Sequence, residues 1–209
     1  MIFNKDKVYL AFYKGNDKLL DKIITWTSRG IYSHVEIIID NVSYSSSGRD
    51  GGVRRKALGT MHYNDINKWD IFELKVEDIN LFKDKFNLIQ KEKRFGSFSF
   101  QKHDRLEKNG KYDYWSIILY HILRIPIFKK VQNNRFLCTE LILEIIQFCL
   151  SIDYIKVSNN TVNKLQYKAF NEGFKTTPTN VLELLTSLEL INRKISNEEV
   201  KRNDKWFFK

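Results

Sequence analysis

The clearest pattern of hydrophobic and polar positions lies between residues 31 and 53. Apolar residues take every second position on both sides of a turn-forming pair, Asp40-Asn41: Val35, Ile37 and Ile39 precede it, and Val42 and Tyr44 follow it. Alternation with a period of two, interrupted by such a turn, is typical of a β-hairpin. We therefore expect two antiparallel strands with one apolar and one polar face.

The polar face of this hairpin carries the first candidate chemistry. His34 and Glu36 are two residues apart, so their side chains point the same way. A two-residue turn places Ser45 opposite Glu36 and Ser47 opposite His34, whereas one more residue in the loop places Ser46 opposite Glu36. Both registers put an imidazole beside a carboxylate and hydroxyl groups, which can orient a general base. The alternative is that His34 is an ordinary packed histidine and Glu36 a solvated charge.

Periodicity elsewhere predicts two further strands and several helices. Strands are expected over residues 7–13 and 69–74, which are rich in β-branched and aromatic side chains. Helices are expected over residues 19–27, 76–94, 116–123, 138–150 and 158–170, and from Thr177-Pro178 onward. The segment 187–209 is either a final strand or an arm that docks on a partner. The other histidines, His62, His103 and His121, are expected to have no ligand role.

The helix expected over residues 138–150 begins near Cys138. In the first turn of a helix, the macrodipole and the free backbone N–H groups stabilise a thiolate, which is the nucleophilic form of cysteine. Those amides can also donate to an oxyanion. Cys149 lies roughly 16 Å further along the helix axis, so the two sulfurs cannot form a disulfide. The alternative for Cys138 is a small buried hydrophobic residue, which is also the simplest interpretation of Cys149.

Length and charge bound the classes of function. The chain has 209 residues, 43% of them hydrophobic, which suffices for one large domain with a buried core. We place this domain at residues 1–186 and treat 187–209 as a C-terminal extension or arm. The net charge of +10, from 35 Lys and Arg against 25 Asp and Glu, favours an acidic partner. Because the basic residues are scattered along the chain, solvated surface charge is the alternative.

The remaining composition excludes several classes. Two cysteines without metal-binding spacing indicate neither a disulfide framework nor a structural zinc, and we expect no metal and no cofactor. Charges at Lys5, Asp6 and Lys7 argue against a signal peptide, and no apolar run is long enough to span a membrane. These features predict a soluble chain.

A run of small and polar residues follows the second strand of the hairpin. Gly51-Gly52 permits the close approach of a ligand, and Arg49, Arg54 and Arg55 could bind an anionic group there. A turn with solvated arginines is the alternative.

Two motifs, taken together, resemble the circularly permuted branch of the NlpC-type papain-like cysteine hydrolases: Ser33-His-Val-Glu-Ile37 on a strand and Phe136-Leu-Cys-Thr-Glu-Leu-Ile142 at a helix start. This branch includes lecithin retinol acyltransferase-like proteins and several phage and poxvirus proteins. Its histidine strand comes first and its nucleophile helix comes late. The resemblance spans about residues 8–150, and Thr177-Pro178 is similar to a late loop and helix of the family. It implies an α+β, papain-like fold in which an antiparallel sheet packs against helices.

The resemblance also implies catalytic roles. Cys138 would be the nucleophile, and His34 the base that takes its proton and returns it to the leaving group. The third member in the family is usually a His, Asn or Glu on the strand after the histidine, where this chain has serines at positions 45–47. Glu36 is our candidate replacement, with Ser45 or Ser46 as lesser ones. The expected catalytic residues are Cys138, His34, Glu36 and Ser46.

The implied activity is that of a thiol hydrolase or acyltransferase which forms an acyl-enzyme with an amide or ester. Peptide, peptidoglycan or lipid are the substrates expected, and Ser45, Tyr112 and Arg49 are the residues expected to bind them, since Tyr112 parallels a tyrosine in the family's groove. The alternative is a degenerate papain-like fold that serves as a basic binding or virion structural protein. The Lys-, Asn- and Ile-rich composition and the phage-like serine segment suggest a viral source, with the protein in the host cytoplasm or the virion.

Overall fold

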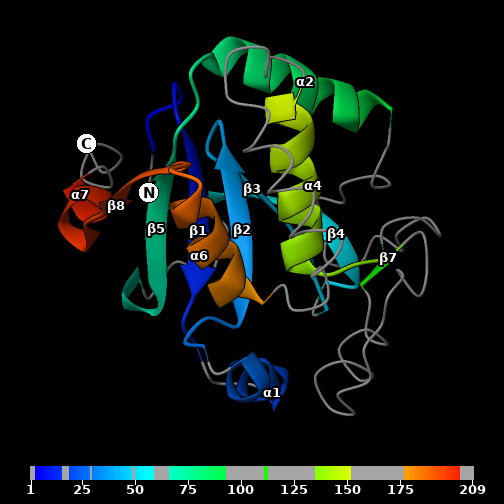
Figure 1. Ribbon diagram of the computed structural model, residues 1–209, viewed down its shortest axis with the longest axis vertical. Coiled ribbons are helices and arrows are strands. Elements are labelled where there is room, and N and C mark those ends of the chain that lie inside the picture. The colour runs from blue at the N-terminus through cyan, green and yellow to red at the C-terminus, as the bar shows by residue number, and fades with distance from the viewer. Residues whose placement is uncertain are drawn as a thin grey trace.

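The computed structural model describes residues 3–15, 19–28, 30–48, 50–58, 66–92, 111–112, 135–151 and 177–202 (Figure 1). The strands are β1 (Val8–Tyr13), β2 (His34–Ile39), β3 (Val42–Ser47), β4 (Gly52–Ala57), β5 (Trp69–Leu74), β6 (Lys111–Tyr112), β7 (Arg135–Phe136) and β8 (Ile191–Ile195). The helices are α1 (Leu19–Ser28), α2 (Ile79–Lys91), α4 (Cys138–Ser151), α6 (Pro178–Ser187) and α7 (Asn197–Arg202), with a 3-10 turn η2 (Ile66–Lys68). The protein is therefore an α+β protein, as expected.

A single sheet joins all the described strands in the order β7-β6-β4-β3-β2-β1-β5-β8. Its neighbouring strands are antiparallel, except for the two-residue strands β6 and β7, which run parallel. The strands and helices expected from periodicity are confirmed wherever they fall within the described residues. The helices expected over 116–123 and 158–170 lie outside those residues, as do His62, His103 and His121.

The turn between β2 and β3 fixes the register of the hairpin. Asp40 and Asn41 both have positive φ angles, 51° and 62°, as in the type I′ turn that joins strands through two residues. Ile37 therefore pairs with Tyr44, which is the register of the shorter turn. The alternative with one more residue in the loop is wrong, because it would shift every side chain of β3 to the other face.

Strand β4 was not expected from the sequence. Its residues, Gly-Val-Arg-Arg-Lys-Ala, lack an alternation of apolar side chains, but they pair along their whole length with β3. The segment 187–209 also contributes to the sheet, because β8 pairs with β5 and the buried Ile195 and Val200 pack against that sheet. Of the two alternatives for this segment, its described part is the final strand followed by α7.

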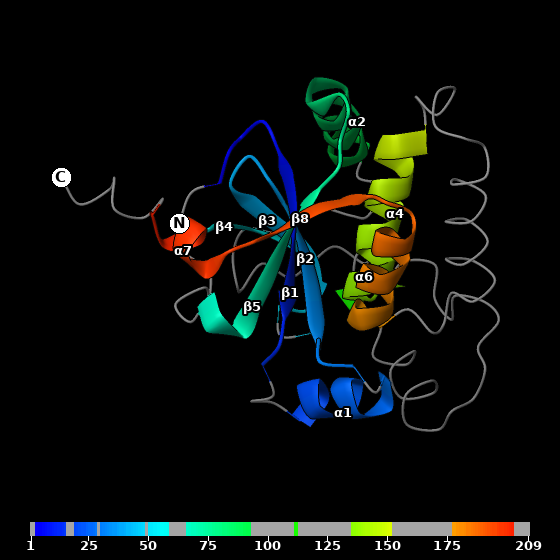
Figure 2. The ribbon, with the colours of Figure 1, turned by 60° about the vertical axis from the view of Figure 1, so that its left-hand side comes forward.

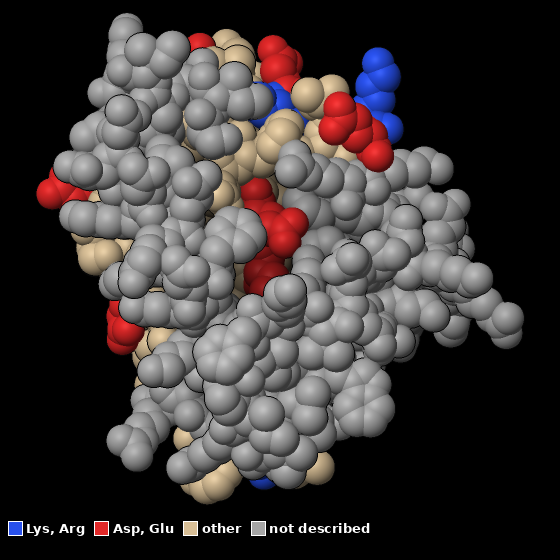
Figure 3. Space-filling model, turned by 45° about the vertical axis from the view of Figure 1, so that its right-hand side comes forward, with Lys and Arg blue, Asp and Glu red and all other residues tan. Residues whose placement is uncertain are grey.

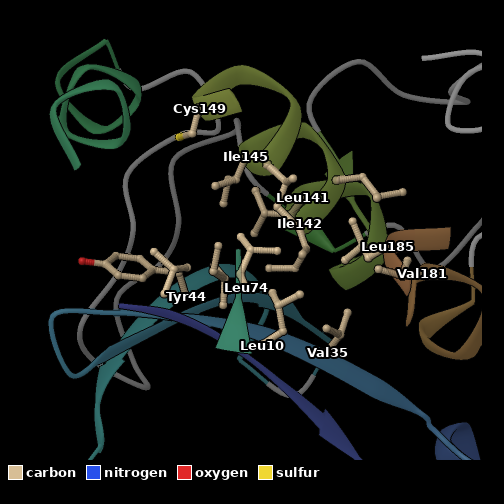
Figure 4. Close-up of a cluster of buried hydrophobic side chains, with 14 of the residues drawn as sticks. Leu10, Val35, Tyr44, Leu74, Leu141, Ile142, Ile145, Cys149, Val181 and Leu185 are labelled. Atoms are coloured by element: carbon tan, nitrogen blue, oxygen red, sulfur yellow. The ribbon is translucent and has the colours of Figure 1, made fainter. Parts of the chain in front are cut away.

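Both faces of the central strands are buried. On one face α2, α4 and α6 pack against side chains of the sheet, as Figure 4 shows for Leu141 and Ile142 of α4 above Leu10 and Val35. On the other face a second cluster contains Tyr9, Ile38 and Trp69. Figure 2 shows α4 and α6 on one side of the sheet, α7 on the other, and α1 at the end where β1 finishes and β2 begins. The centre of the sheet is thus a rigid platform.

Helices α1 and α2 hold the two ends of α4. Ile24 of α1 is buried against Leu137, the residue immediately before α4. At the other end the buried Lys85 of α2 donates a 3.3 Å hydrogen bond from Nζ to the carbonyl oxygen of Cys149. A cation at a helix C-terminus complements the macrodipole. The start of α4, where Cys138 lies, is therefore fixed between the sheet and α1.

None of the helices in the described part of the chain is both long and apolar enough to cross a membrane.

Candidate active site

The structure brings His34 and Cys138 together, although they are far apart in the sequence. His34 is the first residue of β2 and Cys138 is the first residue of α4, and α4 packs on the sheet at β2 and β3. The thiol of Cys138 lies close enough to the imidazole of His34 to raise the pKa of that imidazole. Cys138 is 3% exposed, and the side chain of His34 is 17% exposed. The pair is thus mostly enclosed, and the imidazole is its more open part.

Cys138 lies in the first turn of α4, where backbone N–H groups lack partners within the helix. The carbonyl of Leu137 accepts the first helical hydrogen bond, from the N–H of Leu141, so Leu137 is the N-cap. The carboxylate of Glu140 reaches back and accepts a 2.9 Å hydrogen bond from the N–H of Leu137, which is half of a capping box. Cys138 is therefore the first helical residue, and its N–H group has no partner within the helix. This position favours negative charge on an oxygen bound beside it.

The Nε2 atom of His34 is held by two acceptors. It lies 3.2 Å from Glu36 Oε1 and 3.2 Å from Ser45 Oγ. The Ser45 hydroxyl donates to the carbonyl oxygen of Val35 at 2.8 Å, so its oxygen is left to accept a proton from the ring. An ionised carboxylate can also only accept. Nε2 therefore carries a proton, and Nδ1 is the nitrogen that remains for the thiol of Cys138.

Glu36 is a buried carboxylate with several donors around it. It is 1% exposed, and it accepts hydrogen bonds from the guanidinium of Arg54 and, at 2.5 Å on Oε2, from the hydroxyl of Ser43. Arg54 is itself 8% exposed, and its Nε lies 2.7 Å from Asp50 Oδ2 in a second ion pair. Lys56 Nζ approaches the same Asp50 oxygen at 3.0 Å. A line of alternating charges therefore runs from the imidazole to the β3–β4 turn.

These contacts decide the charge states. Burial alone would raise the pKa of Glu36, but Arg54 above all, with His34 and Ser43, lowers this pKa well below its ordinary value. Burial likewise opposes the charged form of His34, yet the charge and hydrogen bond of Cys138, together with Glu36, raise its pKa from 6.5 to about 9. The surroundings thus favour a protonated, charged imidazole beside Cys138, with an ionised Glu36 behind it.

The other residues expected at the site either lie on the opposite face of the sheet or fall partly or wholly outside the described residues. Ser46 pairs with Val53, and the alternation of β3 turns its side chain to the opposite face from Ser45. Its expected position opposite Glu36 is therefore wrong, because Ser45 occupies that register. The backbone of Tyr112 pairs with Phe136, two residues before Cys138, but the Tyr112 side chain and all of Arg49 lie outside the described residues.

The sequence analysis missed two features of the site. It did not identify Ser43, and it gave Arg54 a different role. We expected Arg54 to bind an anionic group in a loop, but the structure buries it in β4, where it pairs with Glu36. The error follows from the missed strand, because β4 puts Arg54 opposite Ser45, on the same face as Glu36. The two-residue turn could have identified Ser43, since the register it sets places Ser43 beside Glu36 on that face.

Thr139, next to Cys138, has an unusual environment. Its hydroxyl is buried and, within the described structure, has no hydrogen-bond partner. A buried hydroxyl without a partner lowers stability, so such groups are uncommon.

Across the described stretches no three His, Cys, Asp or Glu side chains converge as a metal site requires.

Comparison with known proteins gives no independent assignment: no protein-family model matches the chain, and no curated protein matches it significantly.

Proposed function

We propose that this protein is a cysteine-dependent hydrolase or acyltransferase with a permuted, NlpC-type papain-like fold, and that Cys138, His34 and Glu36 are its catalytic residues. The observation that carries the proposal is that the Cys138 thiol lies close to the His34 imidazole, whose Nε2 is 3.2 Å from the buried carboxylate of Glu36. A nucleophile beside a base that is oriented by a third group is the arrangement such catalysis requires. The late position of the nucleophile helix agrees with the permuted order.

In the proposed mechanism, Nδ1 of His34 takes the thiol proton, and the Cys138 sulfur attacks the carbonyl carbon of an amide or ester. The N–H groups in the first turn of α4 stabilise the oxyanion that forms. When the carbon–nitrogen or carbon–oxygen bond breaks, His34 returns the proton to the departing amine or alcohol, which leaves a thioester on Cys138. Water or an acceptor alcohol then attacks the thioester with His34 as base, and the thiol is restored.

The alternative, binding of an acidic partner through a basic surface, has less support. On the side of the molecule that carries α4 and β7, the charged atoms of described residues that are visible in the central hollow are acidic (Figure 3). The net charge of +10 is therefore not gathered at the described centre of this face.

Replacement of Cys138 tests the proposal directly. We expect iodoacetamide, followed by peptide mapping, to label Cys138 in preference to Cys149, because a base beside a thiol activates it as a nucleophile. Activated esters such as p-nitrophenyl butyrate should leave an acyl group on Cys138. Cys138→Ser should abolish this acylation, and His34→Ala should slow it by about 10²- to 10⁴-fold.

Cys149 provides the matched control. Burial raises the pKa of this second thiol to about 12, so Cys149→Ala should leave both labelling and acylation unchanged. Equal labelling of the two cysteines, or ester hydrolysis that survives in Cys138→Ser, would refute the proposal. A steep loss of nucleic acid binding with added salt would then favour the binding alternative.

A further inference from the structure

We infer that Arg54 is a positioning residue of the site, which keeps the Glu36 carboxylate ionised and aimed at Nε2 of His34. This inference deepens the proposed function and rests on it. Arg54 is hydrogen-bonded to Glu36 and so acts on the imidazole through that carboxylate.

The geometry ties Arg54 to one carboxylate oxygen. Its guanidinium donates to Oε1 of Glu36, the same oxygen that lies 3.2 Å from Nε2 of His34, while Ser43 holds Oε2. Three groups therefore fix the plane of the carboxylate, and Oε1 faces the imidazole. Because a rotated carboxylate would lose at least two of these contacts, Arg54 determines where the acceptor for the ring proton lies.

The electrostatics support the same role. An ionised carboxylate at 1% exposure is stable only if buried donors or cations compensate for the lost water. The titratable or charged groups around it are His34 in β2, Cys138 in α4, Tyr13 opposite His34 in β1, and Arg54, Lys56 and Asp50 on the β4 side. Of these, Arg54 has the largest effect in lowering the Glu36 pKa. His34 cannot replace it, because the imidazole must give up its proton in each turnover.

Asp50 and Lys56 extend the chain of charged contacts behind Arg54. Asp50 holds the guanidinium from behind at 2.7 Å, and Lys56 balances Asp50 at 3.0 Å. The side chain of Arg54 thus lies between two carboxylates, those of Glu36 and Asp50. This arrangement differs from an arginine that waits for an anionic ligand, since its charge is already matched by buried partners.

The test is the pH dependence of Cys138 alkylation by iodoacetamide, followed by mass spectrometry, in Arg54→Met. Loss of the cation should let Glu36 take up a proton at higher pH, so the acid limb of the profile should move upward. At a pH below this shifted acid limb, Arg54→Met should be alkylated about 10- to 100-fold more slowly than the wild type, the range expected when a hydrogen bond to a charged group is lost. Arg54→Lys, which keeps the charge, should show a smaller shift.

A double variant distinguishes positioning from a general loss of structure. In a Glu36→Gln background, Arg54→Met should add little further loss, because its effect passes through Glu36. Arg193→Gln, which removes one positive charge from the edge strand β8, should leave the profile unchanged. Circular dichroism of each variant would verify that the fold is retained.

Effects of Arg54→Met and Glu36→Gln that add independently, or a profile in Arg54→Met that matches the wild type, would overturn the inference. Failure of the proposed function looks different: the wild-type protein itself would then show no enhanced alkylation of Cys138. If Arg54→Met fails to fold, Arg54→Lys tests the geometry of the guanidinium: the smaller shift that it causes should disappear in Glu36→Gln/Arg54→Lys, and a shift that persists there would overturn the inference.

Discussion

Glu36 is the residue whose burial has the clearest consequence for stability. Its pKa in the folded protein is below the ordinary value of 4.5, mainly because of Arg54. The unfolded chain therefore takes up a proton near pH 4.5 that the folded protein does not, so this contribution to stability is present above that pH and is lost as the pH falls. Acid should thus weaken the fold through this residue.

Urea unfolding at pH 6 and pH 3 would measure this effect. In the wild type, Glu36 should reduce the free energy of unfolding by about 1.4 kcal/mol for each pH unit below its unfolded pKa. Glu36→Gln cannot take up this proton, so its stability should depend less on acid. An equal loss in the two proteins would show that the Glu36 carboxylate is protonated in the fold as readily as in the unfolded chain.

At the residue scale, the sequence predicts His34, Glu36 and Cys138 as site residues, but not the arginine that pairs with Glu36. His34 and Glu36 could be placed together because the period of a strand is two, and Cys138 because it precedes an apolar helix. Arg54 could not, because its position depends on which strand lies next to β3. That choice is made by long-range pairing, which leaves little trace in the local pattern of β4.

At the scale of elements, one end of α4 is held by a charged side chain from a neighbouring helix. Lys85 of α2 is buried and donates to the last turn of α4. Lys85→Met keeps the apolar stem but removes the charged donor, so we expect a loss of about 1–3 kcal/mol in the free energy of unfolding. Thermal or urea denaturation would measure it.

A lysine on the same helix serves as control for this prediction. Lys83 pairs with Asp40 at 2.7 Å, but Asp40 is 49% exposed, so Lys83→Met should cost no more than about 1 kcal/mol. If the two variants lose the same stability, the contact between Lys85 and the helix end contributes no more than a surface ion pair.

The elements themselves were largely predictable, and the exceptions share a cause. Strands β1, β2, β3 and β5 have apolar or aromatic residues at the positions that face a core, and α4 has a long apolar stripe. β4 is polar because one of its faces is stabilised by ion pairs, those of Arg54 with Glu36 and Asp50, rather than by apolar contacts. The strands β6 and β7 have two residues each, too few for any period to be recognised.

At the scale of the whole molecule, burial on both faces should make the middle of the sheet its most stable part. All of β1 except Tyr13 and all of β2 except His34 are buried, whereas β8 at the edge has three exposed residues. We expect amide hydrogen exchange to be slowest in β1 and β2 and faster in β8. Mass spectrometry of exchanged peptides would test this order, which exchange in β8 as slow as in β1 would contradict.

The order of the site along the chain has a consequence for synthesis. The imidazole, its carboxylate and the arginine behind them all precede residue 58, whereas the sulfur comes at position 138. At about 5–20 residues per second, a ribosome needs several seconds to travel between them. Under the proposed mechanism, a nascent chain therefore holds the proton acceptor before it holds Cys138, so no acyl-enzyme could form until α4 has emerged and docked.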